Sequence, residues 1–130
     1  MDDIPGLVVL VVDDDPRIRR VLRTIFEGEG FRVLEAEDGG RAIEVASGDP
    51  TPDLIVLDVV MPNRNGWECM TDLKSHSRLR HIPVILLTSR GEHDDQFRGM
   101  AQGADGYVVK PFDPDSLLKA VRRTVGDRAG

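Results

Sequence analysis

Cysteine is nearly absent from this sequence, which contains Cys69 and no other. A single cysteine excludes an internal disulfide framework and a cysteine-based zinc site. No apolar run approaches the roughly 18 residues of a membrane span, and we expect no signal peptide. Basic residues are outnumbered, with Lys+Arg at 17 against Asp+Glu at 23, so the net charge is −6. These features argue against direct binding to nucleic acid or to a membrane, and they favour a reducing, cytoplasmic compartment.

The overall composition is that of a folded domain. Hydrophobic residues make up 40% of the chain and charged residues 31%, which is typical of globular proteins and unlike a disordered chain. The length of 130 residues fits one domain. We therefore expect a single domain over residues 1–130, with a core from about Leu7 to Val125. Residues 126–130 are expected to form a tail or the start of a linker.

Five short apolar runs indicate strands. Residues 7–12, 53–58 and 84–88 are continuous and rich in branched side chains, which is typical of strands that are covered on both faces. The run at 31–36 partly alternates apolar with polar residues, and the run at 107–110 is short. These two runs are therefore expected at the edges of the sheet.

Helical patterns separate the five runs. Asp15 and Pro16 form a good cap and first-residue pair for a helix that ends near Gly28. Further helices are expected near residues 42–46, 67–73, 92–102 and 114–125. This alternation predicts an α/β fold, namely a three-layer, doubly wound, five-stranded parallel sheet. The edge assignments agree with the flavodoxin-like strand order 2-1-3-4-5.

Polar residues follow the apolar runs at the carboxyl ends of the predicted strands. The first run is followed by three aspartates at 13–15, and the third ends in Asp58. The fourth run ends in Thr88 and Ser89, and the fifth ends in Lys110. Ligands of doubly wound sheets bind at the carboxyl ends of the strands. The coincidence of acidic, hydroxyl and cationic groups at this one edge therefore predicts a functional site.

The first of these loops is acidic and lacks glycine. No glycine occurs between Val12 and Arg17, whereas phosphate-binding loops in nucleotide-binding folds are rich in glycine. Clustered carboxylates repel one another, and a hard divalent cation such as Mg²⁺ relieves that repulsion. The simpler alternative is helix capping, which we assign to Asp15. With the cap supplied by Asp15, we interpret Asp13 and Asp14 as cation ligands rather than as a solvated loop.

Four segments of the sequence together resemble the receiver domain of two-component response regulators, with chemotaxis regulators as the nearest type. The segments are VVDDDP at 11–16, PDLIVLDVVMP at 52–62, PVILLTS at 83–89 and GADGYVVKPF at 103–112. The resemblance covers nearly the whole chain. A lone DD or KPF would be weak, but the four segments in this order are highly specific.

The resemblance implies a role for each polar residue at the strand ends. Asp58 is expected to accept the phosphoryl group, with Thr88 and Lys110 as its catalytic partners. Thr88, Ser89 and Lys110 are expected to bind the phosphoryl oxygens. Tyr107 matches the aromatic residue that switches position when the phosphoryl group arrives.

The resemblance also implies a magnesium site, in which Mn²⁺ can substitute. Asp14 and Asp58 would bind Mg²⁺ directly, Asp13 would bind it through water, and the backbone oxygen of Val60 would supply a further ligand. The Lys110–Pro111 peptide bond is expected to be cis, which an X–Pro bond tolerates.

The expected function is therefore signalling by phosphoryl transfer. The donor would be a phosphohistidine on a cognate histidine kinase or phosphotransfer protein. Phosphorylation would switch the surface formed by the predicted helix near 92–102, the strand at 107–110 and the helix at 114–125, and this surface would control a downstream partner or output domain. The chain would not be a dedicated enzyme, but an acceptor that catalyses its own phosphorylation and dephosphorylation. The main alternative is a pseudo-receiver, a protein-interaction module that carries no phosphate. An aspartyl-phosphate phosphatase is less favoured, because Val60 stands where such enzymes have a second aspartate.

Overall fold

The structure is a computed structural model that describes residues 6–58, 66–89 and 103–129. The predicted helix near 92–102 lies outside these residues. The five strands are β1 (Val8–Val12), β2 (Arg32–Ala36), β3 (Leu54–Asp58), β4 (Val84–Ser89) and β5 (Gly106–Lys110). The helices within the described residues are α1 (Pro16–Gly28), α2 (Gly39–Ala46), α3 (Gly66–Ser75) and α5 (Pro114–Ala129).

All five strands form one parallel sheet in the order β2-β1-β3-β4-β5. This order confirms the prediction of a flavodoxin-like sheet. Every residue of β1 and β3 is buried, as the continuous apolar runs predicted, because these strands lie inside the sheet and are covered on both faces. The outer strands β2 and β5 contain exposed or half-buried positions, so the edge assignments are also confirmed.

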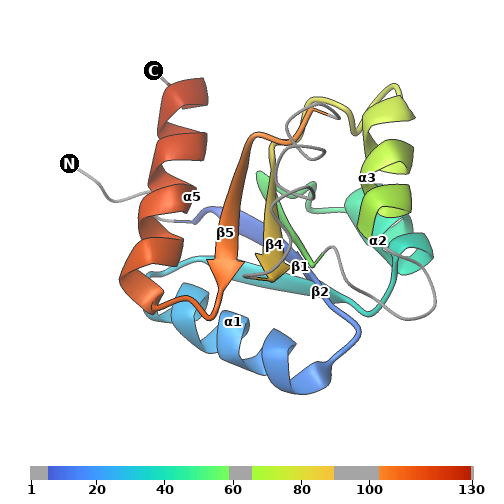
Figure 1. Ribbon diagram of the computed structural model, residues 1–130. Coiled ribbons are helices and arrows are strands. Elements are labelled where there is room, and N and C mark those ends of the chain that lie inside the picture. The colour runs from blue at the N-terminus through green and yellow to red at the C-terminus, as the bar shows by residue number, and fades with distance from the viewer. Residues whose placement is uncertain (1–5, 59–65, 90–102, 130) are drawn as a thin grey trace.

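Helices cover both faces of the sheet and create two hydrophobic cores. Figure 1 shows α1 and α5 on one side of the sheet, and α2 and α3 on the other. Successive residues of β1 alternate between the two sides. Val9 and Val11 pack with the buried residues of α1 and α5, whereas Leu10 and Val12 pack with those of α2 and α3. The three layers therefore follow from apolar strand residues that face both ways.

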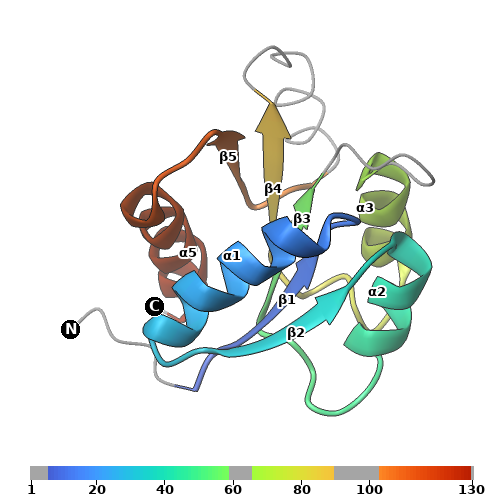
Figure 2. The ribbon, with the colours of Figure 1, turned by 90° about the horizontal axis from the view of Figure 1, so that it is seen from below.

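Helix α1 is fixed at its start by a cap and along its length by the core. The Asp15 carboxylate accepts a hydrogen bond from the backbone N–H of Arg17 at 2.9 Å, and Pro16 is the first helical residue. Both features match the sequence prediction. Leu22 and Phe26 are fully buried on the inner face. The axis of this helix is thereby held against the sheet directly after the acidic loop (Figure 2).

The described residues include two cis peptide bonds and a last helix that is longer than expected. The Lys110–Pro111 bond is cis, as expected, and Asp49–Pro50 is a second cis bond that the sequence did not signal. Helix α5 continues to Ala129, although a tail was expected from Gly126. A glycine weakens a helix by about 1 kcal/mol but does not by itself end it.

Within the described part of the chain, no helix is both long and apolar enough to cross a membrane.

The packing of α1 gives a direct test of the fold. We expect Leu22→Ala to lower the free energy of unfolding by about 2–5 kcal/mol, because it leaves a cavity in a fully buried site. The matched control is Val21→Ala, in the same turn, where the side chain is 49% exposed. The control should change stability by no more than about 0.5 kcal/mol. Chemical denaturation followed by circular dichroism measures both, and equal effects would contradict this packing.

Candidate functional site

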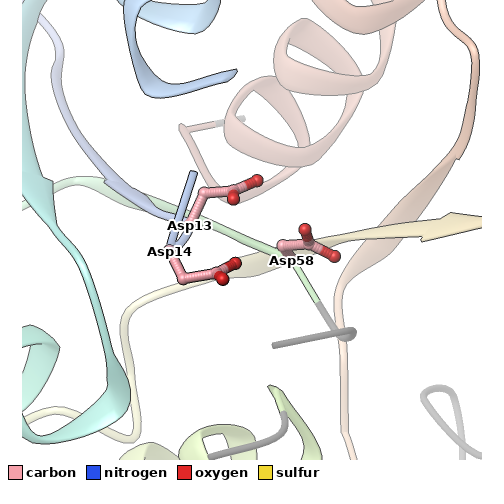
Figure 3. Close-up of side chains that lie close together, drawn as sticks. All are labelled: Asp13, Asp14 and Asp58. Carbon is pink, nitrogen blue, oxygen red and sulfur yellow. The ribbon is translucent and has the colours of Figure 1, made fainter. Parts of the chain in front are cut away.

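Three aspartates meet at the carboxyl edge of the sheet. Asp13 and Asp14 directly follow β1, and Asp58 is the last residue of the neighbouring strand β3. Carboxylate oxygens from all three lie within 4.8 Å of one another (Figure 3). Asp13 and Asp58 are buried, with 1% and 4% of their surfaces exposed, whereas Asp14 is exposed. The strand order thus unites acidic residues that are about 45 positions apart in the sequence.

Asp13 is held by hydrogen bonds between backbone groups of other residues and both its own N–H and its carboxylate. Its N–H donates to the carbonyl oxygen of Ala36 at 3.1 Å, which continues the pairing of β1 with β2. Its Oδ1 atom accepts a hydrogen bond from the N–H of Asp15 at 2.9 Å. Its Oδ2 atom is buried and has no hydrogen-bond partner among the described residues. One carboxylate oxygen of Asp13 is therefore available for a ligand.

The position of Asp13 makes its negative charge costly. Burial raises the pKa of Asp13 from 3.8 to about 7. The N–H of Asp15 opposes this rise in pKa, and the nearby charge of Asp58 adds to it. A buried carboxyl group with an unsatisfied oxygen and a like-charged neighbour is the environment that a divalent cation relieves.

Asp58, on the central strand, has a cationic partner on the edge strand β5. The Nζ atom of Lys110, at the end of β5, lies 2.8 Å from Oδ2 of Asp58. Since β4 lies between β3 and β5, the lysine side chain spans one whole strand to make this contact. Asp58 thus combines proximity to two other carboxylates with a direct ion pair. Its carboxylate can act as a nucleophile toward a group whose negative charge Lys110 would help to neutralise.

Thr88 occupies the intervening strand β4. It is fully buried, and its Oγ1 atom has no hydrogen-bond partner among the residues that the structure describes. In the sheet register, Asp58 is opposite Leu87, so Thr88 lies one residue further toward the carboxyl edge. An unsatisfied buried hydroxyl costs free energy, and native structures contain few of them. The hydroxyl is therefore suited to a ligand that arrives at Asp58.

The remaining predicted residues occupy different positions. Ser89 is the last residue of β4 and pairs with Lys110 in the sheet register. Tyr107 lies on the edge strand β5, where 43% of its surface is exposed. Val60 lies outside the described residues. The structure therefore brings Asp13, Asp14, Asp58 and Lys110 together, with Thr88 on the strand between Asp58 and Lys110.

One residue at the site was missed by sequence reasoning. The Nη1 atom of Arg19, on α1, donates to the carbonyl oxygen of Asp13 at 2.6 Å. Its Nε atom donates to Glu35 on β2 at 2.9 Å. Arginines on the polar face of a helix are usually solvated, and no motif distinguishes this one from Arg20. Only the meeting of α1, β2 and the acidic loop in space identifies Arg19.

The sheet order and the charged groups at its carboxyl edge define a class: a doubly wound α/β domain with its polar site at the strand ends. A family model described as the response regulator receiver domain matches residues 9–122. The chain therefore belongs to the response regulator receiver domain family. Mg²⁺ binding and phosphorylation are general properties of this family.

Relatives of the chain include full-length regulators. The phosphate regulon transcriptional regulatory protein PhoB of Escherichia coli (strain K12) is 42% identical over 124 residues, which cover 93% of this chain and 54% of PhoB. The transcriptional regulatory protein SrrA of Staphylococcus aureus (strain NCTC 8325 / PS 47) is 38% identical over 114 residues, covering 88% of this chain and 46% of SrrA. The chain thus spans about half the length of these curated relatives.

Solved structures of receiver domains are also similar. The chemotaxis protein CheY4 of Vibrio cholerae matches with a TM-score of 0.84 at 34% identity, covering 92% of this chain and 98% of CheY4. The signal receiver domain of a signal transduction histidine kinase from Syntrophus aciditrophicus also has a TM-score of 0.84 at 34% identity, covering 94% and 92% of the two chains. The same fold is therefore found both in a chemotaxis protein and in a domain of a histidine kinase.

The raised pKa of Asp13 predicts that Asp13→Asn stabilises the metal-free protein and that added Mg²⁺ offsets this difference. The folded protein keeps this proton up to a pH of about 7, whereas the unfolded chain loses it near 3.8. The Asp13 contribution to stability therefore falls as the pH rises through this window. At pH 8 without metal, we expect Asp13→Asn to be more stable than the parent by on the order of 1–3 kcal/mol. Added Mg²⁺ should stabilise the parent more than the variant, since Asn is a weaker cation ligand.

Urea denaturation at pH 8, with and without MgCl₂, measures this effect. The matched control is Asp15→Asn, because Asn caps a helix about as well as Asp does. The control should leave both the metal-free stability and the gain from Mg²⁺ close to those of the parent. A metal-free Asp13→Asn protein that is less stable than the parent would contradict the strained environment assigned to Asp13.

Proposed function

We propose that this chain is a phospho-accepting receiver that takes a phosphoryl group onto Asp58. The observation that carries the proposal is the position of Asp58, which is buried at the carboxyl edge of the sheet, 2.8 Å from Lys110 and grouped with Asp13 and Asp14. Its carboxylate oxygen attacks the phosphorus of a phosphohistidine. The P–N bond of the donor breaks as the P–O bond of an acyl phosphate forms.

The three aspartates are suited to hold Mg²⁺ or, in its place, Mn²⁺. Asp14 and Asp58 are the direct ligands in this proposal, Asp13 acts through water, and the backbone oxygen of Val60 completes the protein ligands. The unsatisfied Oδ2 atom of Asp13 and the oxygen-only donor set fit this group. When bound, the cation neutralises charge on the attacking carboxylate and on the phosphoryl oxygens.

Lys110, Thr88 and Ser89 serve the phosphoryl group itself. Two unit charges about 4 Å apart repel by roughly 4 kcal/mol at an effective dielectric constant near 20, so an anionic nucleophile needs a cation beside it. Lys110 supplies this charge and forms an ion pair with a phosphoryl oxygen after transfer. Thr88 donates its hydroxyl, and Ser89 leaves room for the group to enter. Phosphoryl transfer requires little else from a protein, because positioning and electrostatics dominate its catalysis.

Phosphorylation then changes the surface of the domain. Thr88 moves toward the phosphoryl group, and Tyr107 turns inward from its exposed position on β5. The surface that includes β5 and α5 is thereby altered for a partner or an output domain. Water later hydrolyses the acyl phosphate, which restores the Asp58 carboxylate. The chain is in this sense a self-catalysing acceptor and not a dedicated enzyme.

The proposed partners follow from this chemistry. The donor is a sensor histidine kinase or a phosphotransfer protein, and the signal passes to an output domain or a separate protein. PhoB and SrrA are named as transcriptional regulators and are about twice as long as the matched region, which supports an output that acts through another domain. Residues 1–130 would be the single receiver domain, working in the cytoplasm, without direct contact of its own to nucleic acid or membrane.

Intact-mass measurement tests the acceptor. We expect incubation with Mg²⁺ and a small phosphodonor such as acetyl phosphate to add one phosphoryl group per chain. Asp58→Asn should abolish the adduct, whereas the exposed Asp115→Asn, which makes the same chemical change on α5, should retain it. No adduct with any donor, including phosphorylated kinases, would overturn the proposal and favour a phosphorylation-independent interaction module.

The buried hydroxyl of Thr88 gives a separate test. Thr88→Val keeps the shape of the side chain and removes a hydroxyl that lacks a partner among the described residues, so the metal-free protein should be equally stable or more stable by up to about 1 kcal/mol. The stabilisation gained from Mg²⁺ and beryllofluoride, a phosphoryl mimic, should fall by about 1–3 kcal/mol, since a charge-assisted hydrogen bond is lost.

Denaturation with and without the mimic measures both quantities for Thr88→Val. Thr124→Val, a buried threonine on α5, is the matched control and should keep the full gain from the mimic. An unchanged gain in Thr88→Val would show that this hydroxyl does not contact the phosphoryl group.

A further inference from the structure

We propose that Arg19 is a positioning residue for the acidic site, which holds the backbone of Asp13 so that the aspartate loop keeps a geometry able to bind a divalent cation. This inference rests on the proposed function, because it assigns a role in cation binding at the same site. Arg19 donates to a backbone oxygen and contacts neither the cation nor Asp58 in this proposal. It therefore acts through Asp13 and is not itself a catalytic residue.

The first step of the argument is the way in which Asp13 is fixed. Its N–H is bonded to Ala36 of β2 at 3.1 Å, and its carbonyl oxygen accepts from Nη1 of Arg19 at 2.6 Å. Both backbone polar groups of Asp13 are therefore occupied. With Oδ1 bonded to the N–H of Asp15, three of its four hydrogen-bonding groups are fixed, and Oδ2 has no partner among the residues that the structure describes. Arg19 thus constrains Asp13 from a side chain that belongs to a different element, helix α1.

The second step is the way in which Arg19 is itself oriented. Its side chain is only 16% exposed, and its Nε atom donates to Oε1 of Glu35 at 2.9 Å. Glu35 also accepts from Nε of Arg23 at 2.7 Å. Burial alone would raise the pKa of Glu35, but the hydrogen bonds from Arg23 and Arg19 outweigh burial and lower it. Glu35 is therefore ionised at neutral pH and holds the guanidinium group in one orientation.

The third step concerns why this position matters for chemistry. Metal ligands and nucleophiles must be held within about 0.5 Å of the productive geometry. The loop after β1 carries two of the three carboxylates, and Asp14 is exposed. Arg19 connects that loop to β2 through Glu35 and belongs to α1, whose buried face is fixed by Leu22 and Phe26. The loop after β1 is in this way connected to both β2 and α1.

Arg23 provides a matched control within the same helix. It lies one turn after Arg19 and shares Glu35 with it. Its other hydrogen bonds go to Glu27 and to the carbonyl oxygen of Val33, neither of which belongs to the acidic site. Replacement of either arginine by glutamine therefore removes one positive charge and one ion pair to Glu35. Only the replacement of Arg19 removes the bond to Asp13.

The sign of the effect separates positioning from simple electrostatics. Loss of a positive charge beside a cation site should strengthen cation binding if charge alone matters. Positioning predicts the opposite result. Groups that orient metal ligands typically affect metal affinity by 10-fold to 100-fold. We therefore expect Arg19→Gln to raise the dissociation constant for Mg²⁺ by about 10-fold or more, and Arg23→Gln to change it by less than about twofold.

Isothermal titration calorimetry with MgCl₂ at pH 8 measures the affinities of the parent protein and of both variants. Arg19→Lys should recover only part of the affinity, because one ammonium group cannot reach both Asp13 and Glu35 in the way that the guanidinium fork does. Glu35→Gln should weaken binding in the same direction, since it frees Arg19. It serves in place of Arg19→Gln if that variant fails to fold.

Amide hydrogen exchange in the metal-free protein supplies a readout that does not depend on the cation. The N–H of Asp15 is bonded to Asp13, so it should exchange several-fold faster in Arg19→Gln than in Arg23→Gln. A parent protein that binds no Mg²⁺ would overturn the cation site, and this exchange difference would still report whether Arg19 holds the loop. Equal exchange in the two variants, or tighter Mg²⁺ binding by Arg19→Gln, would overturn the role of Arg19.

Discussion

The repulsion among three carboxylates at one edge of the sheet is the constraint on which the rest of this structure depends. Asp13 and Asp58 are buried, so water cannot screen their charges as it does at the surface. The surrounding groups compensate in different ways. Lys110 neutralises Asp58 directly, a backbone N–H is bonded to Asp13, and exposure leaves Asp14 hydrated. Within the described part of the chain, Oδ2 of Asp13 and the hydroxyl of Thr88 have no hydrogen-bond partner, and a cation and a phosphoryl group could satisfy them.

The two hydrophobic cores keep the carboxyl edge of the sheet in place. Alternating residues of β1 belong to two different cores, so neither face of the strand can move without opening one of them. The carboxyl ends of β1 and β3 are thereby fixed relative to each other. Parallel strands also point all their carboxyl ends the same way, which is why residues distant in sequence meet there. The packed sheet thus fixes the relative positions of the residues at its carboxyl edge.

Much of this could be predicted from the sequence because the determining signals are local. Continuous apolar runs identified the inner strands, and Asp15 with Pro16 identified the start of α1. The place of Asp58 and Lys110 followed once the strand order was known. Arg19 could not be found in this way, since its partners Asp13 and Glu35 come from two other elements. The continuation of α5 beyond Gly126 was also missed, because the cost of one glycine is small compared with the sum of its neighbours' preferences.

The ion pair between Lys110 and Asp58 has a mechanical consequence as well as an electrostatic one. Lys110 belongs to the outermost strand, and Asp58 belongs to the central one, so the pair fastens the rim of the sheet to its middle across β4. A change in the charge or size of the group on Asp58 would alter this ion pair and so the link between the two strands. Because Lys110 belongs to β5, such a change would act on the edge strand directly, even if the interior strands did not shift at all.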